Sequence, residues 1–150
     1  MKISFDIIRK LREETGAPVI RVKKVLEEVG GDKKKAFEIL QKEGFEKAAK
    51  REGRETKAGL VETYIHATKT SGATVAIATE TDFVARTPEF QKLAHEIAMQ
   101  VTAFDPKDKE ELLNQPYIRD ESKTIRDLIK EHITKFGENI VIVDFKRFGV

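Results

Sequence analysis

The sequence contains no cysteine, and only four of its 150 residues are proline. Without cysteine the chain can form no disulfide, no thiol nucleophile and no zinc–thiolate site. No apolar run approaches the roughly 18 residues of a membrane-spanning helix. Charged residues also interrupt the apolar positions of the N-terminal stretch MKISFDIIRKLREE, which is not the pattern of a signal peptide. We therefore expect a soluble, cytoplasmic protein.

An excess of charge of one sign is missing as well. Lysine and arginine number 28 and aspartate and glutamate 26, for a net charge of +2. A balance of this kind creates no strong field to attract nucleic acid or an anionic membrane. Basic residues do gather locally, at Lys33–Lys35 and in residues 47–57. A nucleic-acid-associated helical protein, with a helix–turn–helix in its N-terminal part, is therefore the alternative function that the residues leave open.

Motifs that would predict an enzyme are not found. His95-Glu96 resembles the start of the metalloprotease motif H-E-x-x-H, but Met99 stands where the second histidine is needed. The other histidines, His66 and His132, fall on different predicted elements. The glycines form neither a dinucleotide-binding fingerprint nor a P-loop. We expect no enzymatic reaction, no cofactor and no metal site.

Residues 1–46 are predicted to form three short helices. Ser4, Pro18 and Asp32 are placed to start them, and Gly16, Gly30-Gly31 and Gly44 to end them. The apolar residues that recur at helical spacing are Phe5, Ile8 and Leu11, then Val19, Val22, Leu26 and Val29, then Ala36, Phe37 and Leu40. Residues 47–57 then lose the apolar pattern. They are interpreted as a basic linker, helical or extended, or equally as the solvated face of a continuing helix.

Residues 58–150 are predicted to form an α+β lobe. Residues 60–68 and 74–79 are rich in β-branched side chains and indicate a hairpin. Helices are expected after Thr87-Pro88 and after Thr124, with inner faces of Phe90, Leu93, Ile97 and Val101 and of Ile125, Ile129, Ile133 and Phe136. Residues 139–148 predict a last strand in which Val141, Val143 and Phe145 share one face. The expected fold is a three-helix module, a linker, and a small antiparallel sheet of about three strands packed with helices.

Three stretches resemble bacterial translation elongation factor Ts, the family of guanine-nucleotide exchange factors for elongation factor Tu. They are LREETGAPVIRVKKVLEEVGGD, ETDFVAR and GENIVIVDFKRF, in the order that the family has. The resemblance implies a ubiquitin-associated-type fold for the three-helix module. It also implies binding to elongation factor Tu, both GDP-bound and nucleotide-free, with no direct binding of the nucleotide by this chain.

The resemblance assigns the tetrad Thr81, Asp82, Phe83 and Val84 to nucleotide release. In the family, the aspartate and phenylalanine insert between two helices of the partner's nucleotide-binding domain and loosen GDP and magnesium. Taken as an isolated pair, Asp82 is better interpreted as a turn residue that bonds to nearby backbone, and Phe83 as a core aromatic. The matching flanks and the N-terminal module reverse this preference.

A second contact with the partner is implied for Val19, Ile20 and Lys23, which occupy positions that the family uses for docking. Val19 also fits a core role, because it lies on the apolar stripe of its helix, whereas Ile20 lies off that stripe. The local sequence departs from the family at Pro18, Val19, Ile20 and Arg21, and again at Ala76 and Ala78 before the tetrad.

The chain is also shorter than long family members, with room for one core lobe only. Short relatives pair as homodimers, and the apolar strand Ile140–Val143 would leave unpaired backbone groups if it lay at a sheet edge. A noncovalent homodimer is therefore expected. The alternative is a monomer in which strand 139–148 lies in the middle of its sheet.

Overall fold

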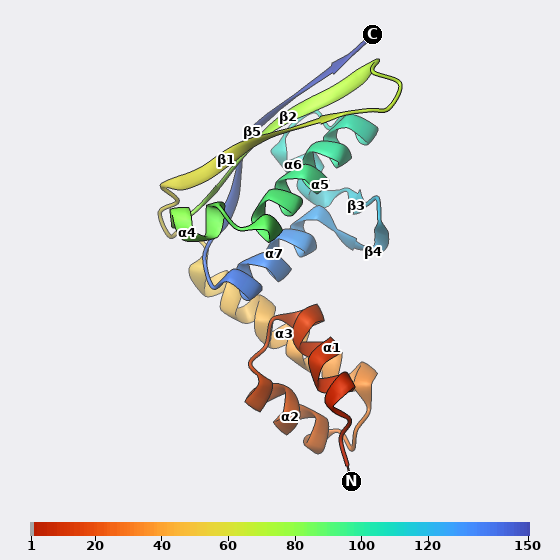
Figure 1. The fold of residues 1–150 in the computed structure, drawn as a ribbon, viewed down its shortest axis with the longest axis vertical. Coiled ribbons are helices and arrows are strands. Elements are labelled where there is room, and N and C mark those ends of the chain that lie inside the picture. The colour runs from red at the N-terminus through yellow and green to blue at the C-terminus, as the bar shows by residue number, and fades with distance from the viewer. Residues whose placement is uncertain (1) are drawn as a thin grey trace. The chain divides into compact units, whose positions relative to one another are not determined.

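The structure is a computed structural model that describes residues 2–150 (Figure 1). It consists of two compact units. The first comprises Met1–Glu52 and Lys130–Gly137, and the second comprises Gly53–Ile129 and Glu138–Val150. None of the helices in the described part of the chain is long and apolar enough to cross a membrane.

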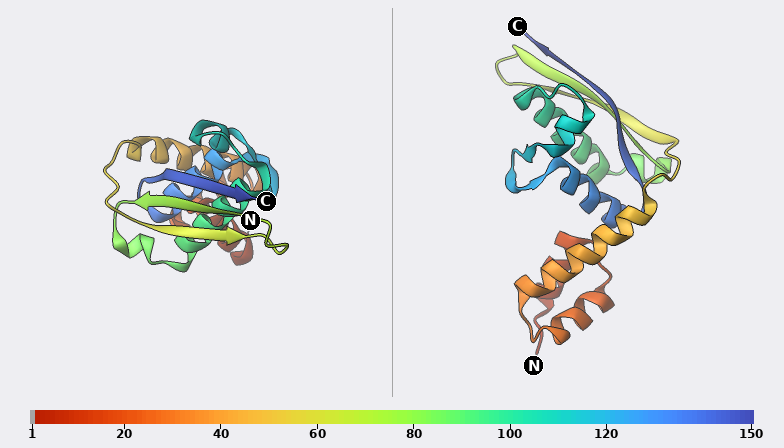
Figure 2. Two further views of the ribbon diagram at one scale, coloured as in Figure 1. Left: turned by 90° about the horizontal axis from the view of Figure 1, so that it is seen from above. Right: turned by 180° about the vertical axis from the view of Figure 1, so that it is seen from behind.

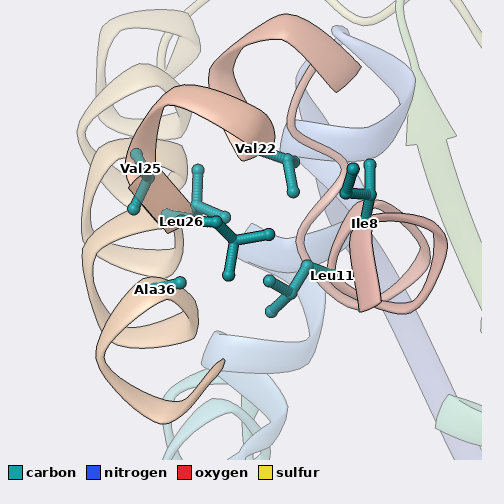
Figure 3. Packing of buried hydrophobic residues seen from close by; sticks show 7 residues of the cluster. Ile8, Leu11, Val22, Val25, Leu26 and Ala36 are labelled. Carbon is teal, nitrogen blue, oxygen red and sulfur yellow. The ribbon is translucent and has the colours of Figure 1, made fainter. Parts of the chain in front are cut away.

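Three helices account for most of the first unit: α1 (Phe5–Thr15), α2 (Val19–Glu28) and α3 (Lys33–Arg51). The Ser4 hydroxyl accepts a hydrogen bond from Asp6 N at 3.3 Å, and the Asp32 carboxylate accepts one from Lys35 N at 3.1 Å. Both predicted helix starts are therefore confirmed. One apolar cluster lies between the helices (Figure 3); its buried members are Ile8, Leu11, Val22, Val25, Leu26, Ala36 and Leu40.

Phe5 does not belong to this cluster, contrary to the sequence prediction, because its residue surface is 78% exposed. Phe5 is the first residue of α1, and helical side chains tilt toward the helix N-terminus. At the end of a helix this direction carries the side chain past the neighbouring helices.

Gly44 does not end the third helix, which is a second correction. Helix α3 continues through Gly44 to Arg51, so residues 47–51 are helical and the irregular segment starts only at Glu52. A Cβ atom at Gly44 would lie 2.9 Å from Thr134 Cγ2, and the Thr134 hydroxyl donates to Gly44 O at 2.9 Å. The glycine therefore allows close approach of another segment of the same unit. The division into 1–46, 47–57 and 58–150 stays a prediction.

The second unit contains a three-stranded antiparallel sheet in the order β1 (Ala58–Ile65), β2 (Ser71–Thr79), β5 (Ile140–Gly149). Helix α5 (Pro88–Phe104) packs against one face of this sheet (Figure 2). Thr87 caps α5 by accepting from Phe90 N at 3.2 Å, as predicted. The four predicted inner residues, Phe90, Leu93, Ile97 and Val101, are at most 1% exposed. The expected α+β fold is confirmed.

Between α5 and α7 (Ile125–Phe136) lie three short elements: α6 (Lys109–Asn114), β3 (Pro116–Tyr117) and β4 (Asp120–Thr124). The β3–β4 pair was not predicted. Two polar residues of α5 hold it: Tyr117 Oη donates to Glu96 at 2.8 Å, and Gln100 Nε2 donates to Pro116 O at 3.0 Å. Burial, reinforced by the bond to Glu96, raises the pKa of Tyr117. Strands this short and polar leave no periodic signal.

Helix α7 begins and ends as predicted. Thr124 N donates to Asp127 Oδ2 at 3.1 Å and Asp127 N donates to Thr124 Oγ1 at 3.2 Å, which is a reciprocal cap. Gly137, with φ of 70°, follows the last helical residue and donates its N–H to Ile133 O at 2.9 Å.

The prediction that Val141, Val143 and Phe145 share one face of strand β5 is wrong. Val141 and Val143 are 38% and 50% exposed, while Ile142 is buried. The register shifts beyond the Ile77–Ile142 pair, so that Asp144 follows as the partner of Ala76 and Val143 is left as an extra residue. This bulge reverses the alternation, and Phe145 pairs with the buried Val75 on the inner face.

Candidate partner-binding site

The tetrad lies where the chain passes from β2 to α5. Strand β2 ends at Thr79, and Thr81 caps the short helix α4 (Asp82–Ala85). The Thr81 hydroxyl accepts from Val84 N at 3.4 Å, and its carbonyl accepts from Ala85 N at 3.2 Å. Capping by a threonine side chain stabilises the first turn of a helix, where the backbone N–H groups have no helical partner. This short capped turn carries Asp82 and Phe83.

The burial within α4 separates its four residues sharply. Phe83 is 91% exposed, Asp82 is exposed, Val84 is half-buried and Ala85 is only 4% exposed. The interpretation of Phe83 as a core aromatic therefore does not hold. Thr81, and not Asp82, supplies the local cap, and within residues 2–150 the Asp82 carboxylate makes no hydrogen bond or ion pair. Both side chains are free to meet another molecule.

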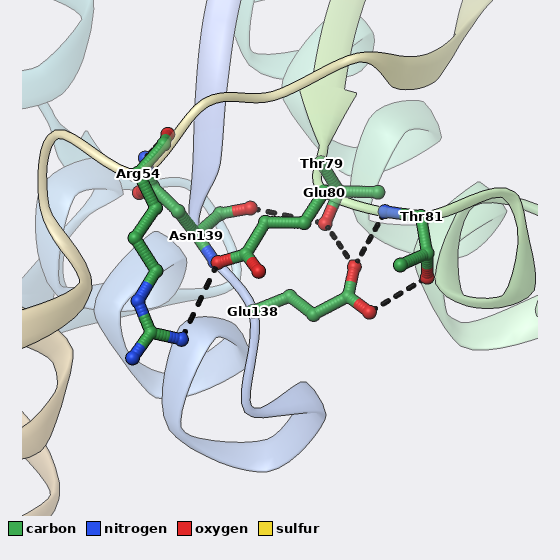
Figure 4. A network of polar contacts seen from close by, with 6 residues as sticks. All are labelled: Arg54, Thr79, Glu80, Thr81, Glu138 and Asn139. Carbon is green, nitrogen blue, oxygen red and sulfur yellow. Dashed lines mark hydrogen bonds and ion pairs between the residues drawn. The ribbon is translucent and has the colours of Figure 1, made fainter.

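A network of polar contacts lies directly behind the tetrad (Figure 4). Glu138, 57 residues further along the chain, accepts from Thr81 N at 2.9 Å and from Thr81 Oγ1 at 2.7 Å. Glu80 accepts from Asn139 N at 2.8 Å, and the Asn139 amide donates to Arg54 O at 3.0 Å. Glu138 was not predicted as a functional residue. The one feature of the sequence that could have pointed to it is its position within GENIVIVDFKRF, one of the three stretches that carry the resemblance.

The docking residues proposed in the first unit lie together on α2. Ile20 is 82% exposed and Lys23 is exposed, while Val19 is 39% exposed and so is not a core residue. Between them, Arg21 Nε donates to Glu43 Oε2 at 2.9 Å and ties α2 to α3. The hydrogen bond from Arg21 lowers the pKa of Glu43. Helix α2 thus presents a small apolar and basic surface on a fixed support. The tetrad belongs to the other unit.

Comparison with known proteins identifies the family. A family model described as "Elongation factor TS" matches residues 80–150, which include the tetrad and Glu138. Elongation factor Ts of Coprothermobacter proteolyticus is 38% identical, and the match covers 99% of this chain and 98% of the relative. The chain belongs to the elongation factor Ts family. Elongation factor Ts of Thermotoga petrophila is 39% identical over 100% of this chain and 97% of the relative, and that of Leptospira biflexa is 39% identical over 100% and 98%.

Membership in the elongation factor Ts family confirms the resemblance seen in the sequence. The match with the Thermotoga relative extends over 193 positions, whereas this chain has 150 residues. The chain is therefore shorter than this relative within the matched span. The stretch 80–150 that matches the family model holds both sides of the Thr81–Glu138 contact.

Two of the side chains that had suggested other functions, His95 and Lys33, have structural partners. The His95 ring packs edge-on against Tyr64, with ring centroids 5.5 Å apart. In the first unit, Lys33 Nζ lies 3.6 Å from a carboxylate oxygen of Glu14. Within the described residues, no three histidine or acidic side chains are grouped so as to hold a metal ion. The family, and not the nucleic-acid alternative, accounts for this chain.

Proposed function

We propose that this chain promotes release of GDP from elongation factor Tu by inserting Asp82 and Phe83 into the partner beside its nucleotide site. As an elongation factor Ts, it is a guanine-nucleotide exchange factor of translation elongation and not an enzyme. It acts where translation takes place, in the cytoplasm. The observation that carries the proposal is that Phe83 is 91% exposed on a turn that its own cap holds in place.

An exposed phenylalanine on a short capped helix suits insertion into an apolar slot. Aromatic side chains bury a large area with few rotatable bonds, and such anchors dominate the energy of many interfaces. Asp82, which has no partner within residues 2–150, remains available to bond to polar groups of the partner. Thr81 and Val84 support this pair, one as the helix cap and the other through its half-buried side chain.

Release of GDP by this route needs no covalent step. GDP is held in its protein largely through phosphate oxygens and a magnesium ion, whose ligands must keep a strict geometry. An inserted side chain that displaces these groups weakens nucleotide binding. Because binding free energies are linked, GDP weakens binding of the exchange protein to elongation factor Tu to the same extent. The chain therefore binds nucleotide-free elongation factor Tu more tightly than the GDP-bound form, without touching the nucleotide.

Val19, Ile20 and Lys23 are proposed to dock on the nucleotide-binding domain of the same partner. Their exposure on one helix supports this role, since an exposed apolar side chain such as Ile20 has a large apolar area to bury against a partner. Two weak contacts on one chain reinforce each other through effective concentration.

The test is the rate at which elongation factor Tu loses a fluorescent GDP analogue, followed with increasing amounts of this chain at physiological salt. We expect a saturable acceleration. Absence of any acceleration, together with binding to RNA or DNA that weakens steeply with salt, would contradict the proposal. It would favour the alternative of a nucleic-acid-associated protein instead.

A further inference from the structure

Glu138 holds the beginning of the tetrad from outside it. Its two carboxylate oxygens accept separate hydrogen bonds from Thr81, one from the backbone N–H at 2.9 Å and one from the hydroxyl at 2.7 Å. Hydrogen bonds to an ionised acceptor are roughly twice as strong as those between neutral groups. Glu138 therefore fixes both the backbone and the side chain of the residue that caps α4.

The direction of the Thr81 hydroxyl links this contact to Phe83. A hydroxyl has one proton and two lone pairs, so a proton given to Glu138 leaves a lone pair for the N–H of Val84. Helix α4 has four residues, and a helix this short does not hold itself together. Its conformation depends on the cap, and the cap depends on Glu138.

Glu138 is itself held in place by hydrogen bonds and buried neighbours. Its neighbour Asn139 is 4% exposed and donates its N–H to Glu80. The segment after β2 and the segment before β5 are therefore joined twice, by the Glu80 carboxylate and by the Glu138 carboxylate. Thr79, which is fully buried, lies within hydrogen-bonding distance of Glu138 Oε1 (3.1 Å) and Asn139 O (3.0 Å). Figure 4 shows these residues gathered at one point of the second unit.

We propose that Glu138 is a positioning residue for exchange, which holds α4 in the conformation that elongation factor Tu recognises before the two proteins meet. This inference rests on the proposed role of Asp82 and Phe83. Glu138 acts through Thr81. Without its carboxylate, α4 samples other conformations, and the apparent affinity falls in proportion to the fraction of molecules that remain competent.

The experiment compares Glu138→Ala and Glu138→Gln with the wild type. For Glu138→Ala we expect the concentration that gives half-maximal GDP release to rise about tenfold, as it would if one molecule in ten stayed competent. The maximal rate should change little, because a bound molecule still inserts Phe83. Glu138→Gln keeps one acceptor oxygen, so its concentration for half-maximal GDP release should lie between those of the wild type and of Glu138→Ala. Phe83→Ala, by contrast, should lower the maximal rate itself.

Amide hydrogen exchange of the free protein separates positioning from general stability. In Glu138→Ala, the amides of Thr81 and Val84 should exchange faster, while those of the buried stretch Leu93–Val101 keep their protection. Glu121→Ala removes an exposed carboxylate of β4 in the same unit and should leave GDP release and protection unchanged.

Three results would overturn the inference. The first is a Glu138→Ala protein with wild-type half-saturation for GDP release. The second is wild-type hydrogen exchange at the amides of Thr81 and Val84. The third is faster hydrogen exchange spread equally over Leu93–Val101, which would make Glu138 a stability residue only. If Glu138→Ala does not fold, the same readings on Glu138→Gln decide. Failure of the proposed function is distinguishable, because Phe83→Ala would then release GDP as fast as the wild type.

Discussion

Phe83→Ala tests the centre of the proposed mechanism, and its magnitude follows from the exposure of the side chain. At 91% exposure, Phe83 contributes almost no packing to the free protein. Its replacement should change the stability by no more than about 0.5 kcal/mol. In the complex, full burial of a phenylalanine contributes about 2–3 kcal/mol. Because about 1.4 kcal/mol corresponds to a factor of ten, catalysed release of GDP should fall roughly 30- to 150-fold.

The assay is stopped-flow release of a fluorescent GDP analogue from elongation factor Tu, with thermal unfolding measured on the same samples. Phe104→Ala is a matched control, since Phe104 is 51% exposed at the end of α5 and lies outside the tetrad. Asp82→Ala should cost less than Phe83→Ala, because polar contacts that water partly reaches contribute less. The reasoning is refuted if Phe83→Ala retains wild-type release, or if it lowers the melting temperature by more than about 5 °C, which would place the ring in a core.

Three further predictions address other parts of the chain. The double variant Ile20→Ala, Lys23→Ala should raise the half-saturation for GDP release about tenfold without a loss of melting temperature; unchanged half-saturation would remove α2 from the interface. Gly44→Leu should lower the stability by about 1–3 kcal/mol in thermal unfolding, because its side chain would overlap the close contact there; an unchanged melting temperature would contradict that contact. The chain should form a noncovalent dimer through the outer face of its sheet, where Val61 and Val143 are 67% and 50% exposed. Light scattering over a dilution series should show a mass that falls with concentration and a monomer for Val61→Glu, Val143→Glu; a wild-type monomer at micromolar concentration that is fully active would refute the dimer.

Structural features that depend on residues close together in the sequence were predicted correctly. Helix starts at Ser4, Asp32, Thr87 and Thr124 were found because capping uses side chains a few positions from the groups they bind. The exposure of Ile20 followed from its place off the apolar stripe of α2. These features need no knowledge of the rest of the fold.

Features that depend on distant partners were missed. Gly44 looks like a helix end in the sequence, and only the contact with Thr134 explains a glycine inside a continuous helix. The alternation of β5 likewise breaks at Val143, because the bulge is a property of the pairing with β2. The edge position of β5 in its sheet was also left open, and the strand order decides against a central position.

The contact between Thr81 and Glu138 follows from that same pairing. On the tetrad side of the bulge, Thr79 faces Ile140, the last pair of the ladder. Continued outward by one residue on each chain, this register puts Glu80 opposite Asn139, and by two residues it puts Thr81 opposite Glu138. These are the pairs that the two carboxylates bridge. A slip of β5 by one residue toward its C-terminus would instead set Glu138 against Glu80, two acids that repel each other. The register between β2 and β5 thus determines whether the cap of α4 has its acceptor, and through the cap how Phe83 is presented.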